Sequence, residues 1–177
     1  MIYDVNANGD PNTVSQDIRT MNAPVLGINC ANSVEIDGTS YCIAFVEAED
    51  GIDCTLAENA PICRTVQGAC TSCEGIYNES NKAAEASQKC ITMNMNLADK
   101  TQLTTILNEL GEQYFADLAS YYGVDRFASS SGKLIGGHTY VYFYYENSTG
   151  RIGNDFTNLD ATGEYKVVGV CVKAESN

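Results

Sequence analysis

The chain has 177 residues, enough for one medium-sized domain with a sizeable hydrophobic core. It carries 10 Lys and Arg residues against 23 Asp and Glu residues, which gives a formal net charge of −13. Because the neutralisation of nucleic-acid phosphates requires a basic surface, this composition excludes nucleic acid as a partner.

The cysteine count favours disulfides over metal or redox sites. The chain has eight cysteines and one histidine, whereas zinc sites usually recruit His as well as Cys. We therefore expect a secreted or cell-surface protein in an oxidising compartment. The sequence holds no signal peptide or membrane-spanning segment and opens on Met1-Ile2-Tyr3-Asp4. We expect a targeting or anchoring segment to precede it, and membrane contact to occur only through that segment.

Residues 1–24 form a polar, turn-rich N-terminal segment, which precedes a predicted domain at residues 25–177. Oxygen-bearing side chains recur there at every second position, a spacing that suits a Ca²⁺ loop. The twelfth loop position, where an EF-hand has Glu, is Ser15. The predicted Ca²⁺ ligands are Asp4, Asn6, Asn8, Asp10 and Asp17. The alternative is a solvated turn rich in Asn, Asp and Gly.

Residues 25–74 open with short β segments. Strands are predicted at Val25–Cys30, Ser33–Ile36 and Tyr41–Val46, with a hairpin turn at Asp37-Gly38. Cys30 and Cys42 flank that turn, so strand pairing would bring the two sulfurs close enough to bridge. We therefore predict a Cys30–Cys42 disulfide.

The stretch from residue 47 to residue 74 is predicted to be a loop with four cysteines. A redox or zinc role for Cys70-Thr71-Ser72-Cys73 is the alternative to structural bridges, but a zinc ribbon needs a second such pair, which is absent from the sequence. Four cysteines allow three connectivities. The pairing that we prefer is Cys54–Cys63 with Cys70–Cys73.

Helical patterns occupy the middle of the chain. Helices are predicted at about Asn78–Met93, from Asp99 as N-cap to Gly111, and at Glu112–Tyr122. The first has a small-residue face, and the second has an apolar stripe at helical spacing. We interpret both as core-facing.

In the C-terminal part of the chain, apolar residues recur at every second position, as in a β-strand. Val141 and Phe143 alternate with tyrosines, so a strand that buries these two residues would expose a row of phenols on its other face. Tyrosine is favoured at binding surfaces because it adds contact area at little entropic cost. The predicted ligand-binding residues are Tyr140, Tyr142, Tyr144, Tyr145, Asn147, Asn154, Asp155 and Asn158. The alternative is that the tyrosine row packs against residues 1–60.

A catalytic site is not evident in the sequence. The one imidazole is His138, which lies in a Gly-rich strand entry, and Ser129, Ser130 and Ser131 are near it only in sequence. A lone His in such a place usually has a structural or ligand-contact role. We therefore expect a protein that is not an enzyme.

The order of these features resembles the C-type lectin-like fold. A helix ends in Cys90, a short turn leads through Leu97-Ala98 into a second helix, and aromatic strands precede a last strand that carries Cys171. This resemblance implies an α+β fold with two to three helices packed on small antiparallel sheets and stapled by disulfides. It also implies a Cys90–Cys171 bridge between the first helix and the last strand.

Two more specific resemblances concern function. Residues 81–107, 140–150 and 168–172 resemble bacterial lectin-like domains that include the variable proteins of diversity-generating retroelements, which rewrite exposed ligand-contact positions near the C-terminus. The string from Asp4 to Asp17 resembles a segment in the globular parts of bacterial pilins and pseudopilins, in which it follows an apolar N-terminal helix that assembles the fibre.

The function predicted from these features is non-enzymatic ligand binding by a protein displayed on a surface. Its partner would be a protein or glycan on another cell or surface, recognised through the Tyr- and Asn-rich C-terminal face. The alternative function is that of a minor pilin or pseudopilin, a structural subunit that contacts other subunits of a surface fibre.

Overall fold

The computed structural model describes residues 33–67, 81–135, 139–155 and 166–175. Within these ranges a seven-stranded sheet is combined with four α-helices and one 3-10 turn. The strands are β1 (Ser33–Ile36), β2 (Thr39–Ala48), β3 (Asn96–Leu97), β4 (Arg126–Ile135), β5 (Thr139–Glu146), β6 (Arg151–Asp155) and β7 (Val167–Ala174). The helices are η1 (Ala57–Asn59), α2 (Ala60–Gln67), α3 (Lys82–Thr92), α4 (Lys100–Leu110) and α5 (Glu112–Tyr122).

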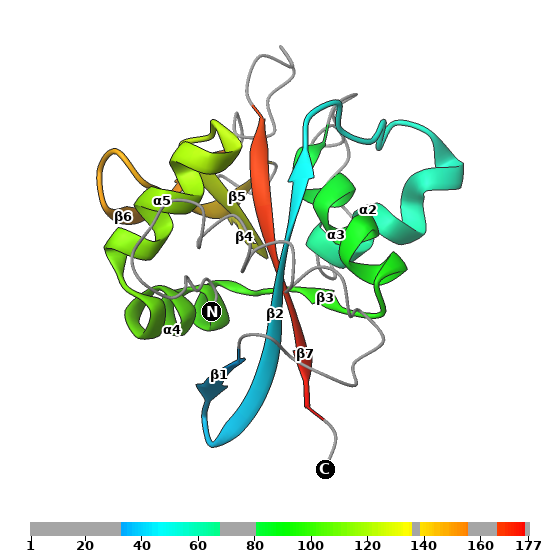
Figure 1. The fold of residues 1–177 in the computed structure, drawn as a ribbon. Coiled ribbons are helices and arrows are strands. Elements are labelled where there is room, and N and C mark those ends of the chain that lie inside the picture. The colour runs from blue at the N-terminus through cyan, green and yellow to red at the C-terminus, as the bar shows by residue number, and fades with distance from the viewer. Residues whose placement is uncertain (1–32, 68–80, 136–138, 156–165, 176–177) are drawn as a thin grey trace.

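The centre of the fold is an antiparallel pair between an early strand and the last one. β2 and β7 are paired from Tyr41↔Ala174 to Ala48↔Val167, and they run side by side through the middle of the molecule (Figure 1). Six successive residues of β7, from Val167 to Val172, are buried. A strand that is buried continuously must be covered on both faces.

Helices cover both faces of this central pair. On one face Val168, Val170 and Val172 of β7 pack in a core with α4 and α5. On the other face Val167 and Cys171 pack in a second core with α2 and α3. Figure 1 shows the two helix pairs on opposite sides of β2 and β7.

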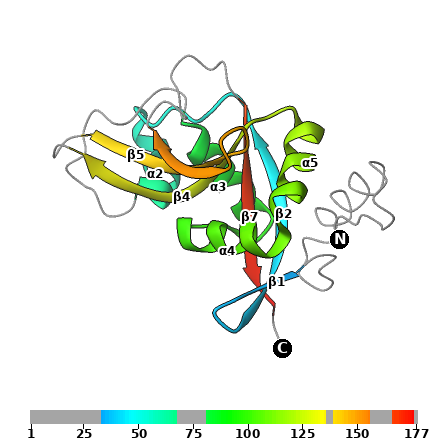
Figure 2. The same ribbon diagram turned by 90° about the vertical axis from the view of Figure 1, so that its left-hand side faces the viewer.

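The sheet order is β1-β2-β7-β4-β5-β6, and β3 adds a short pairing to β7. β4 is parallel to β7 over the three pairs from Arg126 to Ala128, and a register shift follows between Ala128 and Gly132. Figure 2 shows β4 and β5 running across the direction of β2 and β7. The sheet is therefore strongly curled, and its far end carries the β5–β6 hairpin.

Several predicted elements are confirmed. The β1–β2 hairpin turns at Asp37 (φ 50°) and Gly38 (φ 82°), the left-handed conformations that a tight two-residue turn requires. Asp99 caps α4, with Gln102 completing a capping box. The helix predicted at Glu112–Tyr122 has these bounds as α5. The strand predicted at Val25–Cys30 lies outside the described residues.

Other features of the fold differ from the prediction. One curled sheet replaces several small ones, its β4–β7 pair is parallel, and four helices replace two or three in the described part of the chain. The segment Ala60–Gln67 is a helix rather than a loop, because Cys63 and Val66 enter the core beside α3. The sequence pattern did not predict β4, since its Ser-rich bulge interrupts the period of two.

Two predicted disulfides are confirmed. Cys90 on α3 is bonded to Cys171 on β7 with Cα atoms 5.5 Å apart, and Cys54 is bonded to Cys63 with Cα atoms 6.0 Å apart. Cys42 is also disulfide-bonded, while its predicted partner Cys30 lies outside the described residues. Cys70 and Cys73 lie outside them as well. The two bridges are consistent with an oxidising, extracellular environment.

Candidate ligand-binding site

Pairing along β5 sorts its side chains onto the two faces of the sheet. Tyr144 lies opposite Ala128 on β4 and Gly153 on β6, and Tyr145 lies opposite Phe127 and Ile152. Because side chains alternate along a strand, Tyr144 and Tyr145 belong to opposite faces of the sheet. The exposure of each face decides whether it can bind a ligand.

Tyr144 is buried, so the prediction that its ring faces solvent is wrong. The residue is 8% exposed, and the guanidinium carbon of Arg126 lies 4.8 Å from its ring centroid. Arg126 begins the neighbouring strand on the same face and covers the phenol by a cation–π contact. One of the tyrosines expected to contact a ligand is thus largely covered by the protein itself.

Tyr145 belongs to the hydrophobic core. It is 1% exposed, and its ring centroid lies 5.5 Å from that of Phe115 and 6.1 Å from that of Phe127. Burial raises the pKa of the Tyr145 phenol, and the negative charges of Glu112 and Asp125 raise it further. The prediction of a ligand contact at Tyr145 is therefore wrong, because core residues occupy the surroundings of its ring.

Of the remaining predicted site residues, the structure describes some and not others. Backbone pairing sets Asn154 opposite Phe143 and Asp155 opposite Tyr142. Asn147 lies in the turn between β5 and β6 and is partly exposed. The residues that lie outside the described ranges are Asn158 and the predicted calcium ligands Asp4, Asn6, Asn8, Asp10 and Asp17.

The turn between β5 and β6 is held by Asp125, at the entrance to β4. One carboxylate oxygen of Asp125 accepts a hydrogen bond from the Ser148 amide at 2.8 Å, and the other accepts one from the Ser148 hydroxyl at 2.8 Å. The backbone carbonyl of Asp125 accepts from the Asn147 amide, also at 2.8 Å. Three bonds to one residue fix the turn against the rest of the domain.

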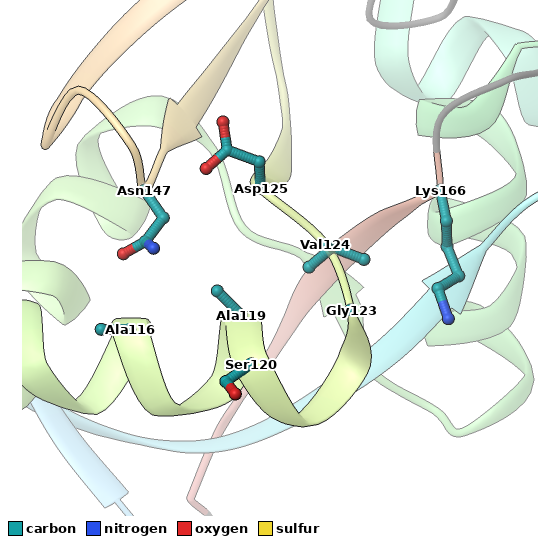
Figure 3. A pocket seen from close by; sticks show the side chains of 8 residues that line it. All are labelled: Ala116, Ala119, Ser120, Gly123, Val124, Asp125, Asn147 and Lys166. Atoms are coloured by element: carbon teal, nitrogen blue, oxygen red, sulfur yellow. The ribbon is translucent and has the colours of Figure 1, made fainter.

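A first open pocket lies between this turn and the C-terminal half of α5 (Figure 3). Its volume is about 560 Å³. Its lining residues are Ala116, Ala119, Ser120, Gly123, Val124, Asp125, Asn147 and Lys166. Small side chains of α5 form its base, and the Asn147 amide group points toward that helix (Figure 3).

A second pocket lies on the other side of the turn. Its volume is about 280 Å³, and its lining residues are Tyr144, Glu146, Thr149, Arg151, Ile152 and Gly153. The Glu146 carboxylate pairs with Arg126 at an N–O distance of 3.5 Å, and both side chains remain about one-fifth exposed (20% for Arg126 and 22% for Glu146). Charged, hydroxyl and aromatic groups therefore converge on this pocket.

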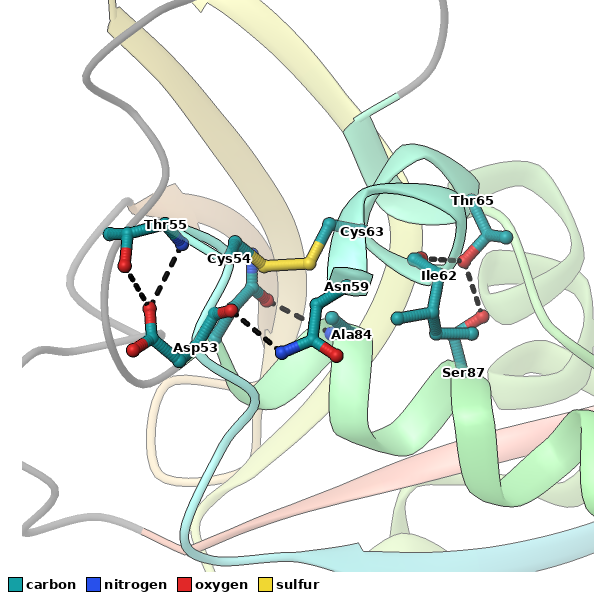
Figure 4. The surroundings of a disulfide bond; sticks show 10 residues. Asp53, Cys54, Thr55, Asn59, Ile62, Cys63, Thr65, Ala84 and Ser87 are labelled. Atoms are coloured by element: carbon teal, nitrogen blue, oxygen red, sulfur yellow. Dashed lines mark hydrogen bonds between the residues drawn. A yellow bond between two sulfur atoms is a disulfide. The ribbon is translucent and has the colours of Figure 1, made fainter. Parts of the chain in front are cut away.

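A disulfide and several hydrogen bonds hold the segment around α2 (Figure 4). Cys54–Cys63 closes the loop around η1, where the Asp53 carbonyl accepts a hydrogen bond from the Asn59 amide group at 2.8 Å. Thr65 on α2 is joined to Ser87 on α3 through their hydroxyls at 2.6 Å. These bonds fasten α2 to α3.

Ser129 has a structural role as well. Its side chain is buried, its hydroxyl donates to the Phe143 carbonyl at 2.9 Å, and it accepts from the Ser131 amide at 3.2 Å. This hydroxyl therefore maintains the β4 bulge. His138, the one imidazole of the chain, lies outside the described ranges.

Within the described residues, no group of three or more His, Cys, Asp or Glu side chains could hold a metal ion. No helix in this part of the chain is long and apolar enough to cross a membrane.

The sequence reasoning missed the residues that shape the second pocket. Glu146 continues the alternation of the tyrosine strand by one further step, and Arg151 is the first residue of β6. Extending the period of two beyond the aromatic residues would have identified Glu146. Arg126 had no such signal, because β4 was not predicted.

Comparisons of the chain with protein-family models, with curated proteins and with solved structures found no match.

Proposed function

We propose that this chain is a non-enzymatic ligand-binding domain that acts outside the cytoplasm and binds its partner at the β5–β6 turn. The observation that carries this proposal is the pair of open pockets flanking the turn that Asp125 holds in place. Binding sites are commonly loops positioned by a rigid scaffold, and the cystine-linked sheet is such a scaffold.

The topology supports assignment to the C-type lectin-like fold. An early strand, β2, pairs with the last strand, β7, and Cys90 on a helix is linked to Cys171 on β7. The Cys90–Cys171 bridge is the relation that the resemblance in the sequence implied. Because folds do not dictate ligands, the partner is proposed from the site and not from the fold.

The burial of the tyrosines changes which residues would contact a partner. Tyr144 and Tyr145 are poor candidates for diversified contact positions, since replacing either would disturb packing. Ser148, Thr149 and Arg151 are exposed around the turn. If a retroelement diversifies this protein, we expect the variation at these exposed positions.

Binding of the biotinylated 177-residue chain to an array of glycans and extracellular proteins tests the proposal. Thr149→Arg adds a long, charged side chain at the mouth of the second pocket, so we expect it to reduce binding at least about tenfold. Thr92→Arg makes the same change at an exposed site on α3 and serves as the control. Equal binding by both variants would place the binding surface elsewhere.

A second candidate function is that of a minor pilin or pseudopilin subunit, which the pilin-like string from Asp4 to Asp17 favours. A fibre subunit can also carry a ligand-binding head, so the two functions are compatible. An apolar helix upstream of Met1 in the complete reading frame, with antibody labelling along surface fibres, would support it. Labelling of the cell envelope without fibres would count against it.

A further inference from the structure

Two of the charged side chains around the second pocket, those of Arg126 and Glu146, are engaged with each other. The Arg126 Nε lies 3.5 Å from a Glu146 carboxylate oxygen, and the Arg126 guanidinium covers the buried Tyr144 ring. The register of the sheet places Arg126 directly opposite Glu146 on neighbouring strands, an arrangement that favours opposite charges. Their charges offset each other, so this pair brings no net charge to the pocket.

Arg151 is the cation that remains at this pocket. It lies opposite Glu146 in the β5–β6 pair, but the Glu146 carboxylate is paired with Arg126 on the other side. Arg151 is exposed, lines the pocket and forms no ion pair with any residue that the structure describes. The second pocket therefore carries a net positive charge, although the chain as a whole is strongly negative.

Gly153 keeps the space beside Arg151 open. The two residues are two positions apart on β6, so they belong to the same face of the strand. A Cβ atom on Gly153 would lie 3.7 Å from both Cζ and Oη of Tyr144, and a larger side chain would fill the space above that phenol. The hollow of about 280 Å³ lies at the low end for ligand sites, a size that suits one side chain of a partner.

We propose that Arg151 receives a carboxylate of a protein partner, from an Asp or Glu side chain, in this hollow; this inference rests on the proposed binding function. A guanidinium presents its N–H donors in a planar fork, to which a carboxylate can bind through two parallel hydrogen bonds. The Thr149 hydroxyl can donate a further bond, because its bond to the Glu146 carbonyl is long, at 3.3 Å. Ile152 offers an apolar contact to the methylene groups of the incoming side chain.

The charge of the whole chain limits which acidic partners can approach. With a net charge of −13, the protein repels polyanions such as sulfated glycans. A single carboxylate on an otherwise neutral or basic protein surface avoids most of this repulsion, because exposed charges more than about 8 Å apart are largely screened at physiological ionic strength. Arg is also one of the residues that contribute most to binding at protein interfaces. A protein surface with an isolated Asp or Glu is therefore the partner that this pocket favours.

Titration of the ¹⁵N-labelled full chain with two matched peptides, followed by two-dimensional NMR, tests the inference. The probes are acetyl-Gly-Glu-Gly-amide and acetyl-Gly-Gln-Gly-amide, which are similar in size and differ in the carboxylate. We expect the Glu peptide to give saturable shifts at the amides of Thr149, Arg151 and Gly153, and the Gln peptide to bind at least about fivefold more weakly. Methyl β-D-glucuronide, a carboxylate on a sugar, should also bind more weakly than the Glu peptide.

Three variants and a control assign the binding to Arg151 and its hollow. Arg151→Gln removes the charge and the fork and should weaken binding of the Glu peptide at least about tenfold, whereas Arg151→Lys keeps the charge alone and should cause an intermediate loss. Arg64→Gln, at an exposed arginine on α2, makes the same change in net charge and should leave binding unchanged. Gly153→Val should abolish the saturable shifts by filling the hollow, while a dispersed spectrum verifies its fold.

The inference would be overturned by the absence of saturable shifts with the Glu peptide, by equal binding of the Glu and Gln peptides, or by unchanged binding in Arg151→Gln. Glucuronide binding as tight as that of the Glu peptide would also overturn it, because the pocket would then not select a protein carboxylate. A chain that binds array proteins through the Thr149 turn but does not bind the Glu peptide would retain the proposed function and lose only the carboxylate assignment.

Discussion

Gly169, in the middle of β7, is a point of close approach between α3 and the sheet. A Cβ atom there would lie 2.7 Å from the Ala86 Cβ, 2.9 Å from a Leu97 methyl carbon and 3.2 Å from a Val46 methyl carbon. These neighbours belong to β2, β3 and α3, which are themselves buried. The small-residue face that the sequence predicted on α3 thus has its counterpart in one glycine of the last strand.

We predict that Gly169→Ala destabilises the domain by about 1–3 kcal/mol, the usual cost of overpacking a core. For a domain of this size the melting temperature should fall by about 2–4 °C for each kcal/mol. Gly153→Ala is the matched control, since its Cβ would make only ordinary contacts at 3.7 Å. Equal melting of the two variants would show that α3 does not approach β7 as closely as described.

Tyr145 makes stability depend on alkaline pH. Its phenol has a raised pKa in the folded protein, so the unfolded chain loses this proton first as the pH rises. The unfolded state then binds fewer protons than the folded state, and the free energy of unfolding falls above about pH 10, the ordinary value for Tyr. Below that pH the contribution is fully present.

We predict that Tyr145→Phe lowers this alkaline sensitivity. Thermal melts at neutral pH and near pH 11 measure the change, with Tyr121→Phe as a control because Tyr121 is exposed. The difference in melting temperature between the two pH values should shrink in Tyr145→Phe and stay as in the unmodified chain in Tyr121→Phe. An unchanged difference in Tyr145→Phe would contradict the buried, uncharged state of this phenol.

At the scale of elements, the Cys90–Cys171 bridge joins α3 to β7 across 81 positions of sequence. α3 packs on β7 through the second core, so the bridge reinforces a contact that apolar burial already makes. Cys54–Cys63 spans nine positions and fastens α2 locally. Because loop-closure entropy grows with loop length, the longer bridge should contribute more stability.

We predict that the double variant Cys90→Ser, Cys171→Ser loses on the order of 4 kcal/mol, a large part of the net stability of a typical domain. Cys54→Ser with Cys63→Ser should lose less, because its loop is shorter. Thermal or denaturant unfolding without reductant measures both. An unchanged unfolding midpoint in the first variant would show that these two sulfurs are not paired.

Local signals predicted part of this arrangement well. The Asp37-Gly38 turn, the Asp99 cap and the α5 bounds all follow from chemistry within a few residues. Features that depend on distant segments were not predicted. The helix α2 depends on core contacts and a disulfide, and the parallel β4–β7 pair depends on packing between segments far apart in the sequence. The Cys90–Cys171 pair was implied by resemblance to a known fold rather than by spacing.

In the candidate site, too, local patterns were predictable from the sequence and long-range packing was not. Alternation along β5 predicts which residues share a face, but it could not reveal that Arg126 covers Tyr144 or that Phe115 and Phe127 enclose Tyr145. The burial of a side chain depends on the strands and helices around it. Alternation within one strand carries no information about those neighbours. The proposed contact residues are therefore those of the turn rather than Tyr144 and Tyr145.

At the scale of the whole molecule, helices cover both faces of the central strands, and the curled end of the sheet carries the β5–β6 turn away from α2 and α3 (Figures 1 and 2). Two disulfides reinforce the covered part. The molecule thus separates a rigid scaffold from the surface that is proposed to meet a partner.

Photo-crosslinking to intact cell surfaces tests the central claim most directly. A diazirine-bearing residue, which inserts into protein and glycan alike, is placed at Thr149 in the turn or at Ile91 on α3, which is 46% exposed. We predict cross-linked partner from the Thr149 position and none from Ile91. Cross-linking from Ile91 alone, or equally from both positions, would contradict a binding site at the β5–β6 turn.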